Sequence, residues 1–403
     1  KSGEQRTYFL LSFWQETRPN MTIFSKDEIE RRQAGIRATL GDSEAAVAFS
    51  FFPSYYLSGV PIIPWGRPTI TIVPRDGPAA MILSEGEASR ARQHSPITEM
   101  HTYNDMDGPN AESAISLLTG LLESQHIGHI SFDATGTTVT TLEMLKTVMP
   151  KLEVSDFSSA LEKLILVSSE EELALVTAAT RIAEQGIATF IEEAKVGIPE
   201  VVLAGRAMME MSEYAAREYG EVESRVNCYS QQGLRSLQPH TGASGEALQP
   251  GVLVTLVVEA YVWNYLTAVE RPLFTGSPTE EQRRYQEATR DAQDAAIEAM
   301  RPGTSFGDVD RASRQVLIAA GYDNIHCGAG LIRGLATEWE GRIDRGNLRL
   351  YNDAPLQPNM VITVEPWAIV PGMGATRYCD PVLVTETGAQ MISSRPDEII
   401  QVG

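Results

Sequence analysis

The chain has 403 residues, of which 43% are hydrophobic and 21% charged, a balance typical of a globular protein long enough for two domains. Its formal net charge of −20 excludes a nucleic-acid-binding protein, because the chain has no excess of basic residues to displace phosphate counterions. The charge still permits an anionic small molecule as a partner, since a few local arginines can bind one. No apolar run approaches the roughly 18 residues that a membrane helix needs.

Three cysteines lie far apart in the sequence, at positions 228, 327 and 379, and none belongs to a CxxC pair. This spacing indicates neither a disulfide framework nor a zinc site, and we expect a cytoplasmic protein. The sequence does not begin with Met, and Met21 precedes a clean helix start. We therefore expect residues 1–20 to be a leader or an added segment rather than part of a domain.

The first part of the sequence predicts a small domain in which strands and helices alternate. Ser25 followed by Glu28 is typical of a helix N-terminus with a capping box, and predicts a helix to about residue 40. Short apolar runs and one amphipathic stretch then predict three strands, a helix and a further strand, at 46–52, 69–73, 79–83, 111–124 and 129–132. We expect this α/β domain to cover residues 21–158.

A second domain is predicted over residues 159–403. Ser169 and Glu172 repeat the capping pattern at the start of a long helical stretch. The predicted helices cover 170–195, 199–220, 278–300 and 307–320, and the predicted strands lie within 251–274, 360–369 and 381–386.

Two glutamates interrupt strand-like apolar runs of this domain. Glu270 lies within residues 265–274, and Glu365 within residues 361–367. A carboxylate in a buried strand costs several kcal/mol unless it is paired or hydrogen-bonded. Arg271 is the nearest ion-pair partner for Glu270, but adjacent strand residues point to opposite faces. A polar pocket that contains both glutamates is therefore the better interpretation.

Among the six histidines, only His240 has a context that suggests catalysis. It lies in a loop, residues 238–242, that leads into the strand-rich stretch, and catalytic groups often lie in loops held by a rigid scaffold. From the residues alone, a structural role for His240 stays equally open. His326 stands beside a glycine-rich loop, residues 327–330, where a structural role is favoured over a place near a site. The histidines at 94, 101, 126 and 129 are interpreted as structural or solvent-facing residues.

Several of these stretches resemble the creatinase family, metal-free members of the pita-bread (M24) fold shared with aminopeptidase P and methionine aminopeptidase. The resemblance lies in residues 237–240, 265–274, 363–366 and 383–388. The longest of these reads Tyr-x-Thr-Ala-x-Glu-Arg-x-Leu-Phe. The resemblance covers roughly residues 25–400 and implies an α+β chain. A small α/β N-terminal domain would precede a C-terminal pita-bread domain, a curved antiparallel sheet covered by helices.

Metal-dependent proteins of this fold hold two ions with two Asp, one His and two Glu. The matching positions are Val257, Ala268, Ala329, Glu365 and Cys379. A single remaining carboxylate cannot hold a dinuclear centre, whose ions need several hard or imidazole ligands each. We therefore expect neither a metal nor another cofactor.

The resemblance implies that His240, Glu270 and Glu365 are the catalytic residues. The substrate-binding residues that it implies are Arg67, Trp65, Arg342 and Tyr265. The two arginines would bind a substrate carboxylate, and Trp65 would face the substrate. Because Arg67 and Trp65 lie in the first domain and the family completes each site from a neighbouring subunit, we expect a homodimer with shared active sites. Leu266, Ala329 and Cys379 depart from the family's pocket residues, so the pocket lining is expected to differ.

The expected function is metal-independent hydrolysis of a C–N bond in a small carboxylate-bearing amidino, guanidino or ureido substrate. Two carboxylates can accept the parallel N–H donors of a planar amidinium, and His240 can pass a proton from water to the leaving nitrogen. Two alternatives stay open. One is a catalytically inactive pita-bread protein that binds a peptide or protein, and the other is a metal-free lyase or hydrolase that acts on a different carboxylate.

Overall fold

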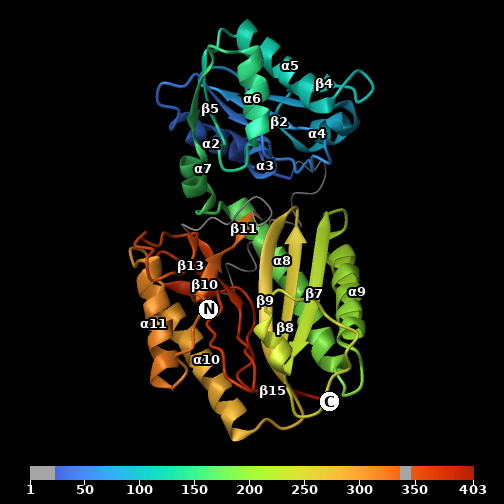
Figure 1. The fold of residues 1–403 in the computed structure, drawn as a ribbon, viewed down its shortest axis with the longest axis vertical. Coiled ribbons are helices and arrows are strands. Elements are labelled where there is room, and N and C mark those ends of the chain that lie inside the picture. The colour runs from blue at the N-terminus through green and yellow to red at the C-terminus, as the bar shows by residue number, and fades with distance from the viewer. Residues whose placement is uncertain (1–22, 336–345) are drawn as a thin grey trace. The chain divides into compact units, whose positions relative to one another are not determined.

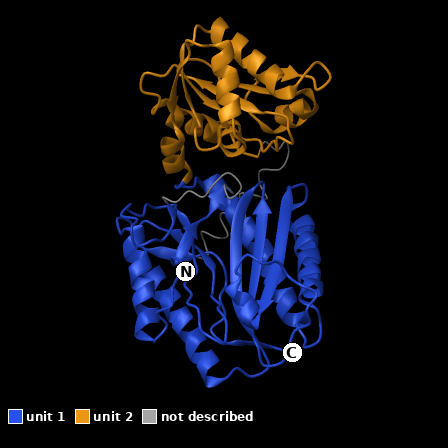
Figure 2. Cartoon of the chain, in the orientation of Figure 1, with its two compact units in different colours: residues 1–5, 166–336, 343–403 blue, residues 6–165, 337–342 orange. Residues whose placement is uncertain are grey.

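The computed structural model describes residues 23–335 and 346–403 (Figure 1). These residues form two compact units, which divide between Ile165 and Leu166 (Figure 2). The division lies seven residues after the predicted domain end at 158, because the helix Ser158–Ile165 packs with the first unit: a Cβ on Gly35 would lie 3.0 Å from Leu164. Over the described ranges, no helix combines the length and apolar character that crossing a bilayer requires.

The N-terminal unit is built on a six-stranded mixed sheet with the order β4-β3-β2-β1-β5-β6. The strands are β1 (Ala45–Ala48), β2 (Ile70–Pro74), β3 (Ala80–Ser84), β4 (Glu99–Tyr103), β5 (His129–Phe132) and β6 (Glu153–Asp156). The helices are α2 (Lys26–Arg37), α3 (Phe51–Ser58), α4 (Ala88–His94), α5 (Asn110–Ser124), α6 (Val139–Val148) and α7 (Ser158–Ile165). A core forms where alternate residues of the sheet, such as Val47 and Ile72, pack against Leu118 and Leu122 of α5.

One predicted strand of this unit ends earlier than expected. The run at 46–52 forms β1, but α3 begins at Phe51. The carboxylate of Asp133 accepts the backbone N–H groups of Phe49 and Ser50 at 2.7 and 3.1 Å, and it accepts the hydroxyl of Ser50 as well. These bonds turn the chain, and their partner lies 84 residues from Phe49, so the local apolar pattern cannot reveal it.

The C-terminal unit contains two sheets. The five-stranded sheet has the order β11-β9-β8-β7 with β15 paired to β9, and the four-stranded sheet has the order β10-β12-β13-β14. The longer strands are β7 (Ser224–Gln232), β8 (Leu253–Val262), β9 (Tyr265–Thr275), β12 (Val361–Val364) and β13 (Asp380–Val384). The shorter ones are β10 (Gly330–Ile332), β11 (Gly334–Leu335), β14 (Ala389–Met391) and β15 (Ile400–Val402). An isolated bridge between Glu270 and Cys379 joins the two sheets.

Long helices cover these sheets. They are α8 (Glu170–Glu193), α9 (Glu200–Tyr219), α10 (Glu280–Ala299) and α11 (Phe306–Ala319). Helices α8 and α9 pack on the five-stranded sheet (Figure 1). Helix α10 packs beside β12 and β14. The capping box predicted at α8 is confirmed: Ser169 Oγ accepts the Glu172 N–H at 3.2 Å, and the Glu172 carboxylate accepts the Ser169 N–H at 2.8 Å. The predicted fold class, a two-domain α+β chain with a C-terminal pita-bread domain, is confirmed.

The register of the central hairpin determines which side chains meet. Trp263 and Asn264 link β8 to β9, and both have positive φ, 46° and 62°, as a type I′ hairpin turn requires. This turn places Val257 of β8 directly opposite Glu270 of β9. Because paired residues share a face of the sheet, both side chains point to the same side.

Candidate active site

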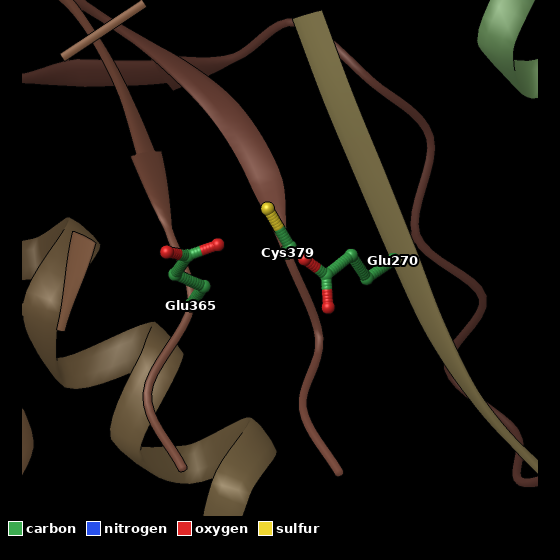
Figure 3. Close-up of side chains that lie close together, drawn as sticks. All are labelled: Glu270, Glu365 and Cys379. Carbon is green, nitrogen blue, oxygen red and sulfur yellow. The ribbon is translucent and has the colours of Figure 1, made fainter. Parts of the chain in front are cut away.

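Glu270 is buried in the middle of β9, on a face shared with Ala268 and Val257. Glu270 is 3% exposed, and its backbone pairs with that of Cys379. The thiol of Cys379 donates a weak bond to the carbonyl of Ala268, with sulfur and oxygen 3.7 Å apart. Figure 3 shows the carboxylates of Glu270 and Glu365 facing a common space beside Cys379. The two glutamates that the sequence singled out therefore meet at one buried site.

Glu365 follows the last residue of β12, and its N–H donates to the carbonyl of Ala329 at 2.7 Å. The predicted strand at 360–369 ends here because Pro366 has no N–H to continue the ladder. Gly330, next to Ala329, allows the close approach: a Cβ on it would lie 2.1 Å from the carbonyl oxygen of Thr363. The glycine-rich loop thus holds β10 against β12 and fixes the backbone of Glu365.

Arg377 completes the site, and no local sequence pattern marks this residue. Its Nη2 lies 2.9 Å from Oε1 of Glu270, and its Nε lies 3.8 Å from Oε2 of Glu365. It sits in an irregular segment before β13 that shows no apolar period. The sequence offered one indirect signal for Arg377. Glu270 and Arg271 point to opposite faces of β9, so a buried Glu270 carboxylate needs a cation other than Arg271.

Burial sets the protonation of this cluster. Burial raises the pKa of Glu270 to about 7; Arg377 opposes this increase, and Glu365 adds to it. Burial, together with the two carboxylates, also raises the pKa of the Cys379 thiol well above its ordinary value. Burial alone would lower the pKa of Arg377, but Glu270 and Glu365 outweigh it, so the guanidinium stays charged.

Two buried atoms of the cluster have no hydrogen-bond partner among the described residues. They are Oε2 of Glu270, an acceptor, and Nε of Arg377, a donor. Buried polar atoms are nearly always bonded in folded proteins, and an unpaired one costs roughly 1–3 kcal/mol. Together with the two facing carboxylates, these unsatisfied atoms make the cluster the candidate ligand site.

Neither His240 nor Tyr265 makes a hydrogen bond or ion pair with this cluster in the part of the chain that the structure describes. His240 is exposed and, within the described ranges, makes no hydrogen bond or ion pair. Gln231 of β7 fixes the loop of His240, because its Nε2 donates to the carbonyls of Gln238 and Thr241 at 2.7 and 2.6 Å. Tyr265 lies an odd number of residues from Glu270 on β9, so it points to the opposite face, where its hydroxyl donates to Glu172 of α8 at 2.8 Å.

The other expected substrate-binding residues belong to the N-terminal unit or lie outside the described residues. Arg67 pairs with Asp105 at 2.5 Å, and Trp65 is 77% exposed. Arg342 falls outside the described residues, as does the expected leader at 1–20. The roles assigned to His240, Tyr265, Trp65 and the two arginines stay predictions.

Arg271 confirms the expected separation from its neighbour Glu270. Its guanidinium pairs with both carboxylate oxygens of Asp380, at 2.7 and 3.2 Å, on the far side of β9. Arg271 is 1% exposed and Asp380 is not exposed at all. Adjacent residues of one strand thus serve different partners.

A curved antiparallel sheet covered by helices, with a polar cluster buried where its two halves meet, defines a pita-bread protein. Residues 174–386 match metallopeptidase family M24, and residues 32–167 match the creatinase/prolidase N-terminal domain. The chain belongs to metallopeptidase family M24.

Its relatives in this family include peptidases. An uncharacterized peptidase of Bacillus subtilis, YqhT, is 29% identical over 72% of this chain and 79% of its own length. The Xaa-Pro dipeptidase of Pyrococcus furiosus is 29% identical over 64% of this chain and 72% of its own length. The prolidase structure from Pyrococcus horikoshii OT3 superposes with a TM-score of 0.79 at 23% identity, covering 92% of this chain and 100% of that one.

These relatives overturn the expected function. The prediction of a metal-independent hydrolase for a non-peptide C–N bond, and with it the class of amidinohydrolase, is wrong, because the relatives from Bacillus subtilis and Pyrococcus furiosus are a peptidase and an Xaa-Pro dipeptidase. Creatinase from a Bacillus species is also related, at 25% identity over 97% of this chain and 96% of its own length. The motifs that suggested creatinase describe a scaffold that peptidases share, so they could not specify the substrate.

The family name implies metal ions, and the donor set can be tested against them. The five positions expected to hold two ions do lie together: Val257 faces Glu270, Cys379 contacts Ala268, and Glu365 bonds to Ala329. Three of the five carry aliphatic side chains without donor atoms. The residues therefore do not fit a dinuclear centre.

Proposed function

We propose that this chain is a peptidase that hydrolyses the peptide bond of a short peptide at the cluster of Glu270, Glu365 and Arg377. The observation that carries the proposal is the position of this cluster. It is buried where the two sheets of the C-terminal unit meet, and relatives of this domain are named as peptidases and Xaa-Pro dipeptidases. A dipeptide is a small molecule that carries a carboxylate, so it still belongs to the class of substrate expected from the sequence.

The cluster has the groups that hydrolysis of an amide requires. Glu365, the more accessible carboxylate, would take a proton from water as the oxygen attacks the carbonyl carbon. Nε of Arg377, which has no hydrogen-bond partner among the described residues, would donate to the carbonyl oxygen as negative charge develops there. Glu365 would then return the proton to the leaving nitrogen as the C–N bond breaks. Glu270 would hold Arg377 in place through the 2.9 Å ion pair.

A panel of dipeptides, with and without proline as the second residue, tests the proposal. We expect release of free amino acids, measured by mass spectrometry, and a loss of at least about 100-fold in kcat for Glu365→Gln, since general acid–base catalysis contributes roughly 100- to 10,000-fold. Arg377→Lys should lose activity as well, because a lysine cannot place a donor where Nε stands. The matched control is Glu298→Gln, an exposed glutamate at the end of α10, which should keep full activity.

The assay is run after chelation and again with added divalent ions. If the wild-type protein releases no amino acid from any dipeptide under either condition, the chain is not a peptidase. Full turnover by a correctly folded Glu365→Gln protein would equally overturn the assignment.

We also propose that the chain forms a homodimer through the N-terminal loops that carry Trp65 and Arg67. Trp65 is 77% exposed at a φ of 42°, and Ile63 and Met106 nearby are 47% and 89% exposed. The Arg67–Asp105 pair links the loop of Trp65 to the loop of Met106. Large apolar side chains exposed on neighbouring loops are typical of protein–protein contacts. The cytoplasmic location stays a prediction.

A further inference from the structure

The hairpin that contains β12 and β13 is open in the middle. Its two arms, residues 361–370 and 374–384, pair at their base through β12 and β13. Near the tip, Val370 and Gly374 form an isolated bridge in the same register. Between the base and this bridge, the described residues form no backbone hydrogen bond from one arm to the other. The ladder is therefore interrupted where the candidate active site lies.

The opening gives the site its charged groups. Glu365 lies at the start of the gap on the first arm, and Arg377 lies on the second arm, three residues before β13. In a closed ladder Cys379 would pair with Glu365, but its backbone pairs instead with Glu270 of β9 (Figure 3). Arg377 lies 2.9 Å from Glu270 and 3.8 Å from Glu365. The separation of the arms therefore decides where these groups stand.

One buried hydroxyl bridges the two arms. Tyr285 of α10 is fully buried, and its Oη lies 2.6 Å from the carbonyl oxygen of Ala368 and 3.0 Å from that of Thr376. The N–H groups of the same two residues donate to this hydroxyl, at 3.4 and 3.2 Å. Ala368 and Thr376 stand opposite each other in the register of the hairpin. The hydroxyl thus takes the place of a direct pair of backbone hydrogen bonds.

We propose that Tyr285 is a positioning residue, which holds the arms at the separation that lets Glu365 and Arg377 act on one peptide bond. The proposal rests on the peptidase function proposed above. Thr376 adjoins Arg377, and Ala368 lies three residues from Glu365, so a shift at either contact moves a charged group of the site.

Other side chains fix the second arm without joining it to the first. Oγ of Ser236 accepts the N–H of Ala375 at 2.8 Å, and Oγ1 of Thr255 in β8 donates to the carbonyl of the same residue at 2.9 Å. These bonds hold the arm of Arg377 from one side. The connection to the opposite residue of the first arm is the hydroxyl of Tyr285.

Tyr285→Phe keeps the ring and removes the bridge. We expect kcat on a dipeptide to fall at least tenfold, because misplacing a reacting group by about 1 Å can cost roughly 100-fold. KM should stay within about threefold of the wild type, since Arg377 acts on charge that develops in the transition state.

Tyr322→Phe is the matched control. The rings of Tyr322 and Tyr285 lie 5.1 Å apart between centroids, and the buried hydroxyl of Tyr322 has no hydrogen-bond partner among the described residues. The same chemical change therefore removes no bridge here, and this variant should keep the kcat and KM of the wild type.

Alkylation of buried thiols reports on the arms without any substrate. Cys379 lies on the second arm, two residues from Arg377, whereas Cys228 lies in β7, and both are buried. Mass spectrometry of peptides follows each thiol in the native protein. We expect Tyr285→Phe to make Cys379 react severalfold faster through local opening, with Cys228 unchanged, and Tyr322→Phe to change neither. If the wild type cleaves no dipeptide, the peptidase proposal fails, and the thiols still decide the role of Tyr285.

Hydrogen exchange of the wild type needs no substitution. The N–H groups of Ala368 and Thr376 should exchange slowly, although their only acceptor among the described residues is the hydroxyl of Tyr285. Fast exchange of both groups would overturn the proposal. So would a wild-type kcat or unchanged alkylation of Cys379 in a folded Tyr285→Phe chain, or equal losses in Tyr322→Phe. Thermal melts establish folding, and hydrogen exchange decides if Tyr285→Phe does not fold.

Discussion

Buried charges in this chain differ in how completely they are satisfied. Asp380 accepts bonds from Arg271 and also from Ser393 and Gln293, so every charge of that pair is matched. Glu270, one residue from Arg271, keeps an unpaired oxygen. A fully satisfied pair holds strands together, while a partly satisfied carboxylate is free to bind a ligand. The number of partners distinguishes the structural residue from the candidate functional one better than burial does.

Asp133 offers a test of how burial shifts stability with pH. Burial raises its pKa from 3.8 to about 6, although the bonds from Phe49 and Ser50 oppose the shift. Because the folded protein holds this proton more tightly than the unfolded chain, the carboxyl stabilises the fold below about pH 4, and this contribution is lost as the pH rises through about 6. A shift of about two units corresponds to at most about 3 kcal/mol.

The asparagine at this position in Asp133→Asn does not titrate. We therefore expect the stability of the wild type relative to this variant to fall between about pH 4 and about pH 7, measured by urea unfolding at both values. A stability difference that stays constant across this range would show that Asp133 is already ionised at low pH in the folded chain.

At the scale of elements, the close approach of β10 to β12 requires a residue without a Cβ atom at position 330. A Cβ on Gly330 would lie 2.1 Å from the carbonyl oxygen of Thr363, closer than any real contact. We expect Gly330→Ala to push the two strands apart, to lower the free energy of unfolding by about 1–3 kcal/mol and to displace Glu365. The matched control is Gly388→Ala, where a Cβ would meet nothing within 4 Å.

Chemical denaturation measures the stability of both variants, and the rate of dipeptide hydrolysis reports the displacement of Glu365. Equal stability of the two alanine variants would contradict the assigned role of Gly330.

Local patterns predicted most of the elements but only part of the site. Helices α8 and α10 follow from their apolar period, and the cap of α8 from Ser169 and Glu172, because these signals lie within a few residues. Glu270 and Glu365 could be singled out because a charge inside an apolar run is conspicuous. Arg377 could not, since its partner Glu270 lies 107 residues away and its own segment is irregular. The end of β1 was missed for the same reason, because Asp133 is distant in sequence.

At the scale of the whole molecule, the proposed dimer makes a complementation test possible. If Arg67 of one chain serves the cluster of the other, then Glu365→Gln and Arg67→Ala chains are each inactive as homodimers. Heterodimers of the two would contain one site with both residues intact. We expect mixing to restore about a quarter to a half of the wild-type rate on a peptide substrate, as symmetric two-site assemblies allow.

Sedimentation shows whether the wild type is a dimer, and a Trp65→Ser change in the exposed patch should weaken it. A mixture that stays inactive while heterodimers demonstrably form would mean that each chain works alone.

The bridge between Glu270 and Cys379 also bears on how the chain folds. Arg271 and Asp380, the adjoining pair, are 109 residues apart, and closing so long a loop costs conformational entropy before any contact compensates for it. The consecutive strands β7, β8 and β9 can pair earlier, as can the strands of the four-stranded sheet, so the site forms only when these two parts meet. Cys228, inside β7, and Cys379 are both buried thiols. In a Cys327→Ser chain, protection of Cys228 from alkylation during refolding would report the pairing of β7 with β8, and protection of Cys379 would report the joining of the two sheets. The two thiols therefore time separate steps of folding, and the one at the site should be protected last.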